Sequence, residues 1–177
     1  MDPQEFYRSK RDALIKEFES FRAEPYLDAH GIPTIGWGAT SYEDGTAVTM
    51  NDPAITAQRG EELYNHHVGM VTDQLQSVPN WGDLSPSQQA ALTSFGFNTG
   101  AGVFTNPEGY ETLQSAVATG DSDQIGAAMK LYIDKGTSAE AGLRRRRDAE
   151  VQLMNTPYPA LEQFNNIVDR ARKALGY

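Results

Sequence analysis

Apolar residues recur at helical spacing along most of this chain. Near the beginning, Leu14, Ile15, Phe18 and Phe21 would share one face of a helix. An apolar face of this kind has to be buried against another element. The pattern therefore predicts a first helix that packs on a core, with Glu19 near its C-terminal end.

The longest predicted helix covers about residues 52–78. It is introduced by Asp52 as the capping residue and Pro53 in the first turn. Its apolar positions are Ile55, Leu63, Met70, Val71 and Leu75. About seven turns is long for a small domain and is typical of a helix that connects two lobes.

Further helices are predicted in the second half of the chain. Ser85 and Gln88 form a capping-box pattern with Pro86 between them, which opens a helix that stops near Gly100. Three shorter helices are expected at about residues 108–118, 122–133 and 138–154. Capping boxes introduce the last two, Asp121 with Gln124 and Thr137 with Glu140.

An amphipathic stretch at 161–175 follows a break at Pro157-Tyr158-Pro159 and predicts a last helix. Its apolar stripe indicates core packing, with a partner interface as the alternative.

Residues 19–40 follow a different pattern, two short extended runs around Ala29-His30-Gly31. A three-residue turn with glycine in the last place makes Asp28 the end of one strand and Ile32 the start of the next. In this register Tyr26 faces Thr34, and Asp28 lies diagonally from Thr34, roughly 7 Å away. Pro33 predicts an edge or a bulge in the second strand. The sequence thus predicts an α+β protein that is mostly helical, with one small antiparallel sheet near the N-terminus.

Two carboxyl groups and a hydroxyl in this region suggest chemistry. Glu19 falls at the C-terminal end of the first helix, where the helix dipole disfavours negative charge and favours the protonated acid. Asp28 in the polar turn would stay ionised and, with Thr34, could hold a water molecule. One acidic and one ionised carboxyl are what glycoside hydrolysis requires. Spacing alone leaves a second interpretation open, a solvated helix end followed by a polar turn.

Composition excludes several classes of function. The net charge of −9 argues against a general nucleic-acid or anionic-membrane binder, since Arg144–Arg147 is the one cationic block. No cysteine is present, which rules out disulfides and thiolate chemistry. His66 and His67 are neighbours about 100° apart on a helix and cannot chelate one metal, so neither a metal nor another cofactor is expected. Nine of the first twenty residues are charged and no apolar run is long enough to span a membrane, so we expect a soluble chain without a secretion signal.

The spacing of these residues resembles a known family. Glu19, eight residues, Asp28, five residues, Thr34 and then Ile-Gly-Trp-Gly is similar to the catalytic signature of the phage-type lysozymes, an endolysin family of glycoside hydrolases. Residues 84–100 resemble the central buried helix of that family. Residues 142–150 resemble its Gly-Leu-x-x-Arg-Arg-x-x-Glu stretch. Together the matches run from about Glu19 to Met154.

The resemblance implies a single lysozyme-like domain over 1–177 with two lobes and a cleft. The N-terminal lobe would cover about 14–50, the connecting helix 52–78 and the helical C-terminal lobe 84–177. The implied function is that of an endolysin, a muramidase that hydrolyses the β-1,4 bond between N-acetylmuramic acid and N-acetylglucosamine in bacterial peptidoglycan. Such a protein would be a monomer that is made in the host cytoplasm and acts on the wall in the periplasm, without binding nucleic acid or inserting stably into a membrane.

Residue roles follow from the same resemblance. Glu19 would be the general acid, Asp28 would position water or stabilise the cationic sugar, and Thr34 would help to hold that water. Asn98 would face the cleft or else cap its helix, and Trp37 would stack on sugar or else be a structural aromatic. The alternative functions are a lytic transglycosylase and a catalytically silent module that binds peptidoglycan.

Some positions depart from the family pattern. Ser20 stands where glycine usually follows the acid, Ala39 where histidine is common, and Tyr132 where tryptophan is common. The arginine block adds a conflict, because at least one of its side chains, for which we name Arg144, should face the first lobe. An arginine beside Glu19 would favour the ionised carboxylate and oppose acid catalysis. A solvated face with a cleft-wall ion pair is the alternative interpretation of that block.

Overall fold

A computed structural model describes residues 1–106 and 108–159. Over these residues the protein is mostly helical with one two-stranded antiparallel sheet, which confirms the α+β class. No helix in this part is both long and apolar enough to cross a bilayer. The predicted helix at 161–175 lies outside the described residues. The elements in chain order are α1 (Pro3–Glu19), β1 (Arg22–Leu27), β2 (Pro33–Gly36), α2 (Ala57–Leu75), η1 (Trp81–Asp83), α3 (Pro86–Thr99), η2 (Ala101–Phe104), α4 (Glu111–Thr119), α5 (Ser122–Met129) and α6 (Glu140–Met154).

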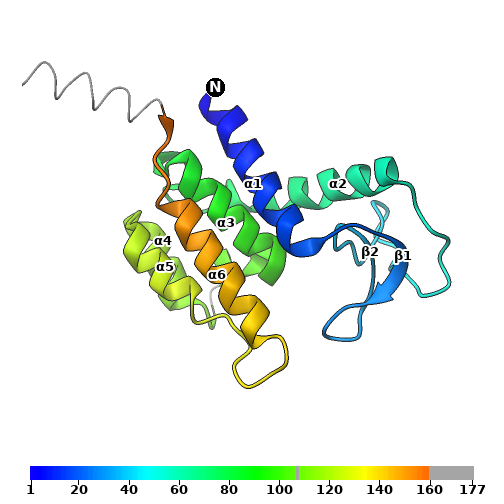
Figure 1. Cartoon of the computed structure of the whole chain (residues 1–177). Coiled ribbons are helices and arrows are strands. Elements are labelled where there is room, and N and C mark those ends of the chain that lie inside the picture. The colour runs from blue at the N-terminus through cyan, green and yellow to red at the C-terminus, as the bar shows by residue number, and fades with distance from the viewer. Residues whose placement is uncertain (107, 160–177) are drawn as a thin grey trace, which may run out of the picture.

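Helix α3 forms the centre of the helical part. Helices α1 and α6 pack along it, and α4 and α5 pack against each other beside it (Figure 1). Buried apolar side chains from α3, α4 and α5 make most of this core, and α2, η2 and α6 add to it. They include Leu92, Phe95, Leu113, Ile125 and Met129. The sequence prediction of a central buried helix is thus matched by α3.

The hairpin of β1 and β2 lies near one end of α2 (Figure 1). Helix α3 packs against α2 and also contacts α1 and α6. A separate small core, built on Ile35, Val48 and Leu63, holds the hairpin region to α2. The division of the whole chain into lobes at 14–50 and 84–177 stays a prediction, because the second range extends past the described residues.

The start of α2 differs from the prediction. The helix begins at Ala57, and Thr56 caps it by accepting a hydrogen bond from the amide of Arg59 at 3.1 Å. Asp52 instead accepts hydrogen bonds from the amide and hydroxyl of Thr49, at 3.0 and 2.7 Å. Asp52 therefore closes a turn before the helix, and α2 has 19 residues.

Helix α1 ends at Glu19, as predicted, but Phe21 lies beyond it. Ser20 follows with φ 53° and ψ 135°, so the chain leaves the helix sharply at this residue. Phe21 packs with its ring 5.6 Å from that of Trp37 instead of continuing the apolar face of the helix.

The predicted pairing across the hairpin is confirmed, but each strand stops one residue short of the prediction, since β1 ends at Leu27 instead of Asp28 and β2 begins at Pro33 instead of Ile32. Tyr26 pairs with Thr34, and the amide of Asp28 donates to the carbonyl of Ile32 at 3.0 Å. Gly31 closes the turn with φ 77°, the left-handed conformation that glycine adopts without strain. The register irregularity falls in β1, between Arg22 and Tyr26, while Pro33 is the first residue of β2.

Two of the three predicted capping boxes need correction. At α3 the reciprocal bonds between Ser85 and Gln88 are both present. At α5 the side chain of Asp121 accepts from two backbone amides, so this cap is one-sided. At α6 the residue before the helix is Ala139, without a side-chain cap, and Glu140 pairs instead with Arg144 one turn further along.

Candidate active site

Glu19 lies where helix α1, the hairpin region and helix α6 meet. Its side chain is 19% exposed, and its Oε1 accepts a hydrogen bond from Nη1 of Arg146 at 2.6 Å. On the other side, Gly38 leaves no room for a side chain, since a Cβ there would lie 2.8 Å from Glu19 Oε2. Both oxygens of Glu19 are therefore enclosed by groups that are distant in sequence.

Asp28 is held by its own turn. One of its carboxylate oxygens accepts hydrogen bonds from the amides of His30 and Ile32, both at 2.8 Å. The side chain is 28% exposed, and its second oxygen lies 3.9 Å from Nδ1 of His30. The carboxylate is thus fixed by its own turn, and the side chain stays partly exposed.

Thr34 is 3% exposed and lies under the hairpin turn. Its hydroxyl donates to the carbonyl of Ile32 at 2.9 Å. The hydroxyl can still accept a hydrogen bond while it donates this one. The predicted role of Thr34 in holding water stays a prediction.

Tyr26, directly across the hairpin from Thr34, is a neighbour of both carboxyl groups; the sequence predicted its pairing with Thr34 but no role for it at the site. Burial raises the pKa of Tyr26, and the charges of Glu19 and Asp28 raise it further. The guanidinium of Arg22 lies 4.6 Å from the centre of its ring. The phenol therefore stays protonated near neutral pH, beside the two acids.

The arginine beside Glu19 is Arg146, which corrects the choice of Arg144. Arg144 is exposed and pairs with Glu140 at 2.7 Å, whereas Arg146 is 4% exposed. Four consecutive arginines point in every direction around a helix, so their own pattern could not show which of them faces Glu19. Glutamates do not decide it either, because Arg144 with Glu140 and Arg146 with Glu150 have the same spacing of four residues, and only burial separates the two pairs.

Asn98 lies on the exposed last turn of α3 and accepts a hydrogen bond from Nη2 of Arg147. The helix is followed by Gly100 as its C-terminal cap, so the capping alternative for Asn98 is not realised. The side chain borders a pocket of about 300 Å³ that Phe18 and Arg146 also line. Asn98 thus adjoins the surroundings of Glu19.

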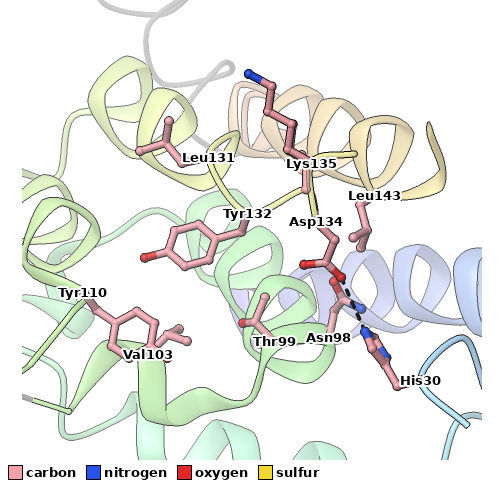
Figure 2. A pocket seen from close by; sticks show the side chains of 11 residues that line it. His30, Asn98, Thr99, Val103, Tyr110, Leu131, Tyr132, Asp134, Lys135 and Leu143 are labelled. Atoms are coloured by element: carbon pink, nitrogen blue, oxygen red, sulfur yellow. Dashed lines mark ion pairs between the residues drawn. The ribbon is translucent and has the colours of Figure 1, made fainter. Parts of the chain in front are cut away.

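A larger pocket of about 530 Å³ opens on the other side of Asn98 (Figure 2). Tyr110 and Tyr132 line it with nearly parallel rings, 6.2 Å apart. His30 from the hairpin turn reaches Asp134 at its rim, with Nε2 and Oδ2 3.4 Å apart. Glu19, Asp28 and Thr34 do not line this pocket, but His30 and Asn98 connect it to them.

Trp37 packs between the first two helices. Its indole N–H donates to Glu61 at 3.1 Å, and the ammonium of Lys16 lies 5.4 Å from its ring centre. These contacts favour the structural interpretation of Trp37, and sugar stacking stays a prediction. Among the residues that the structure describes, no three His, Cys, Asp or Glu side chains are grouped so as to hold a metal ion.

Comparison with known proteins gives consistent matches. The model of the family described as phage lysozyme matches residues 16–150. The endolysin of Salmonella phage P22 is 37% identical over 90 residues, which are 51% of this chain and 60% of that protein. The chain thus spans about 60% of the length of the curated relatives that it matches.

Solved structures with the same fold include the endolysin of Escherichia coli O157:H7 phage FAHEc1, with a TM-score of 0.67 and 27% identity. That match covers 82% of this chain and 90% of that one. The muramidase domain of SpmX from Asticaccaulis excentricus matches with a TM-score of 0.66 and 25% identity, over 85% of this chain and 97% of that one.

Proposed function

The chain belongs to the phage lysozyme family, and we propose that it is an endolysin with muramidase activity. The proposed reaction is hydrolysis of the β-1,4 bond between N-acetylmuramic acid and N-acetylglucosamine in bacterial peptidoglycan. The protein would act as a monomer on the wall in the periplasm after synthesis in the host cytoplasm.

The observation that carries this proposal is that the two carboxyl groups have different surroundings. Glu19 is 19% exposed and is held by an arginine from a distant helix, whereas Asp28 is 28% exposed and is held by two backbone amides of its own turn. The two amide donors hold the Asp28 carboxyl group in one orientation, which suits it for stabilising a cationic sugar or orienting water. Glycoside hydrolysis needs such a group together with a proton donor.

In the proposed mechanism Glu19 protonates the leaving glycosidic oxygen. Asp28 positions the attacking water, with Thr34 as a second contact for that water. An inverting reaction of this kind requires carboxyl groups roughly 6.5–9.5 Å apart, so that water fits between them.

The ion pair with Arg146 does not prevent this role. Arg146 has partners besides Glu19, since its Nε faces Glu150 and its Nη2 faces the carbonyl of Ser94. The guanidinium therefore remains bonded when Glu19 takes up a proton.

The test is incubation of purified peptidoglycan with the protein, followed by mass spectrometry of the released sugar ends. New reducing ends at N-acetylmuramic acid are expected. Anhydro-sugar ends would instead identify a lytic transglycosylase. Binding to the wall without release would identify a silent binding module.

A further inference from the structure

The inward face of α6 carries three buried charged side chains, Arg146, Arg147 and Glu150, which are 4%, 0% and 0% exposed. Removing charges from water is costly, and a buried ion pair seldom stabilises a fold more than apolar side chains of similar size would. Stability alone is therefore a weak reason for this cluster, and its contacts indicate another.

Glu150 contacts both guanidinium groups. Its Oε1 accepts from the hydroxyl of Ser94 at 2.9 Å and from Nε of Arg146 at 3.3 Å. Its Oε2 lies 3.0 Å from Nη1 of Arg147. Burial raises the pKa of Glu150, and the two guanidinium groups act in the opposite direction.

The far ends of the two guanidinium groups reach separate residues of the candidate site. Nη1 of Arg146 pairs with Glu19 at 2.6 Å, and Nη2 of Arg147 donates to Asn98. The guanidinium of Arg147 also lies over Phe95, 4.4 Å from the ring centre. One buried carboxylate thus connects indirectly to two groups at the cleft.

We propose that Glu150 is a positioning residue that orients both arginines at once, Arg146 toward Glu19 and Arg147 toward Asn98. The proposal rests on the proposed function only where it takes Glu19 to be the general acid. The negative charge of Glu150 also offsets part of the positive charge that Arg146 and Arg147 exert on Glu19. It thereby lowers the cost of keeping Glu19 protonated beside an arginine.

The expected pH effect follows from the groups around Glu150. On α6 these are Arg146 and Arg147, and on α3 the neutral Ser94. Glu19 at the end of α1 faces Arg146, and Asp134 acts on Arg147 from the segment before α6. Without the charge of Glu150, the two cations favour ionised Glu19 more strongly, so the acid form is lost at a lower pH.

The experiment is a ¹³C NMR titration of the Glu19 carboxyl in wild type, Glu150→Gln and Glu140→Gln. In Glu150→Gln the midpoint should move down by about one pH unit, and the side-chain amide signal of Asn98 should shift as well. Glu140→Gln is the matched control, because Glu140 pairs with exposed Arg144 at the same spacing on the same helix. Its midpoint should equal that of wild type.

The pH profile of kcat/KM on solubilised peptidoglycan provides a second readout. Its alkaline limb should move to lower pH in Glu150→Gln by the amount seen in the titration. An unchanged Glu19 midpoint in folded Glu150→Gln would overturn the proposal. Since the titration needs no substrate, an inactive wild-type protein would contradict the proposed function without affecting this test.

Ser94→Ala covers the case in which Glu150→Gln does not fold. It leaves every ionisable residue in the sequence and removes one hydrogen bond that favours ionised Glu150, so a smaller fraction of Glu150 carries its charge. A smaller downward shift of the Glu19 midpoint is expected, and an unchanged midpoint would overturn the proposal.

Discussion

The two predicted catalytic carboxyls are held in opposite ways. Asp28 is fixed by amides two and four residues further along the chain. Glu19 is fixed by an arginine 127 residues away, with Gly38 against its other oxygen. The position of Asp28 is thus a property of one turn, whereas that of Glu19 depends on the packing of α1, α6 and the hairpin region. Substitutions can therefore test whether Asp28 depends only on its own turn and whether Glu19 depends on the packing of distant elements.

The largest of these effects is expected for Asp28→Asn. The amide oxygen can still accept from the turn amides, so the hairpin should keep its register, but the negative charge is lost. We expect kcat/KM on peptidoglycan to fall roughly 10²- to 10⁴-fold. Thermal unfolding serves as the fold control. A loss below tenfold would show that Asp28 is not needed for the chemistry.

Gly38→Ala should displace the Glu19 side chain while leaving both Glu19 and Asp28 in the sequence. Gly38 has φ 88°, and an added Cβ would meet Glu19 Oε2 at 2.8 Å. Gly45→Ala is the matched control, with φ 84° and nothing within 4 Å of its Cβ. Both variants should lose roughly 1–3 kcal/mol of unfolding free energy from backbone strain. Only Gly38→Ala should also lose about tenfold or more in kcat, and equal activities would argue against a tightly enclosed Glu19.

Ser20→Gly should stabilise the protein. Ser20 follows Glu19 with φ 53° and ψ 135°, a conformation that is costly for residues with a side chain. Relief of about 1 kcal/mol should raise Tm by about 2–4 °C in calorimetry. Asn80→Gly is the comparison, because Asn80 has φ 64° and ψ 12°, which asparagine tolerates. No stabilisation in Ser20→Gly would mean that this helix exit is unstrained.

The smallest effect is expected at Glu43, an exposed carboxylate that is held by an arginine elsewhere in the sequence. Hydrogen bonding to Arg59 lowers the pKa of Glu43 to about 2 from its usual 4.5. The stabilisation is therefore present above about pH 4.5 and disappears as pH falls through about 2. Glu43→Gln should lower Tm slightly at neutral pH and match wild type near pH 2. An equal difference at both pH values would contradict an electrostatic origin.

Features that depend on a few neighbouring residues could be predicted from the sequence. The turn at Gly31, the pairing of Tyr26 with Thr34 and the Ser85 cap each depend on a few neighbouring residues. The start of α2 was missed because Asp52-Pro53 and Thr56 are both acceptable caps, and Asp52 is used by its own turn.

The choice of arginine beside Glu19 could not be made locally. Arg144 and Arg146 each have a glutamate at a helical spacing of four residues, so one pattern describes both pairs. Only the packing of α6 against α3 buries one pair and exposes the other. The resemblance to the family located the stretch at residues 142–150, and the packing in three dimensions identified Arg146.

The most direct test of the central claim compares Glu19→Gln with wild type in the release of reducing ends from purified peptidoglycan. The introduced side-chain amide can still bond to Arg146 through its carbonyl oxygen but has no proton to donate as an acid. A loss of several orders of magnitude at unchanged Tm and unchanged wall binding is predicted. Release within tenfold of wild type would contradict Glu19 as the general acid.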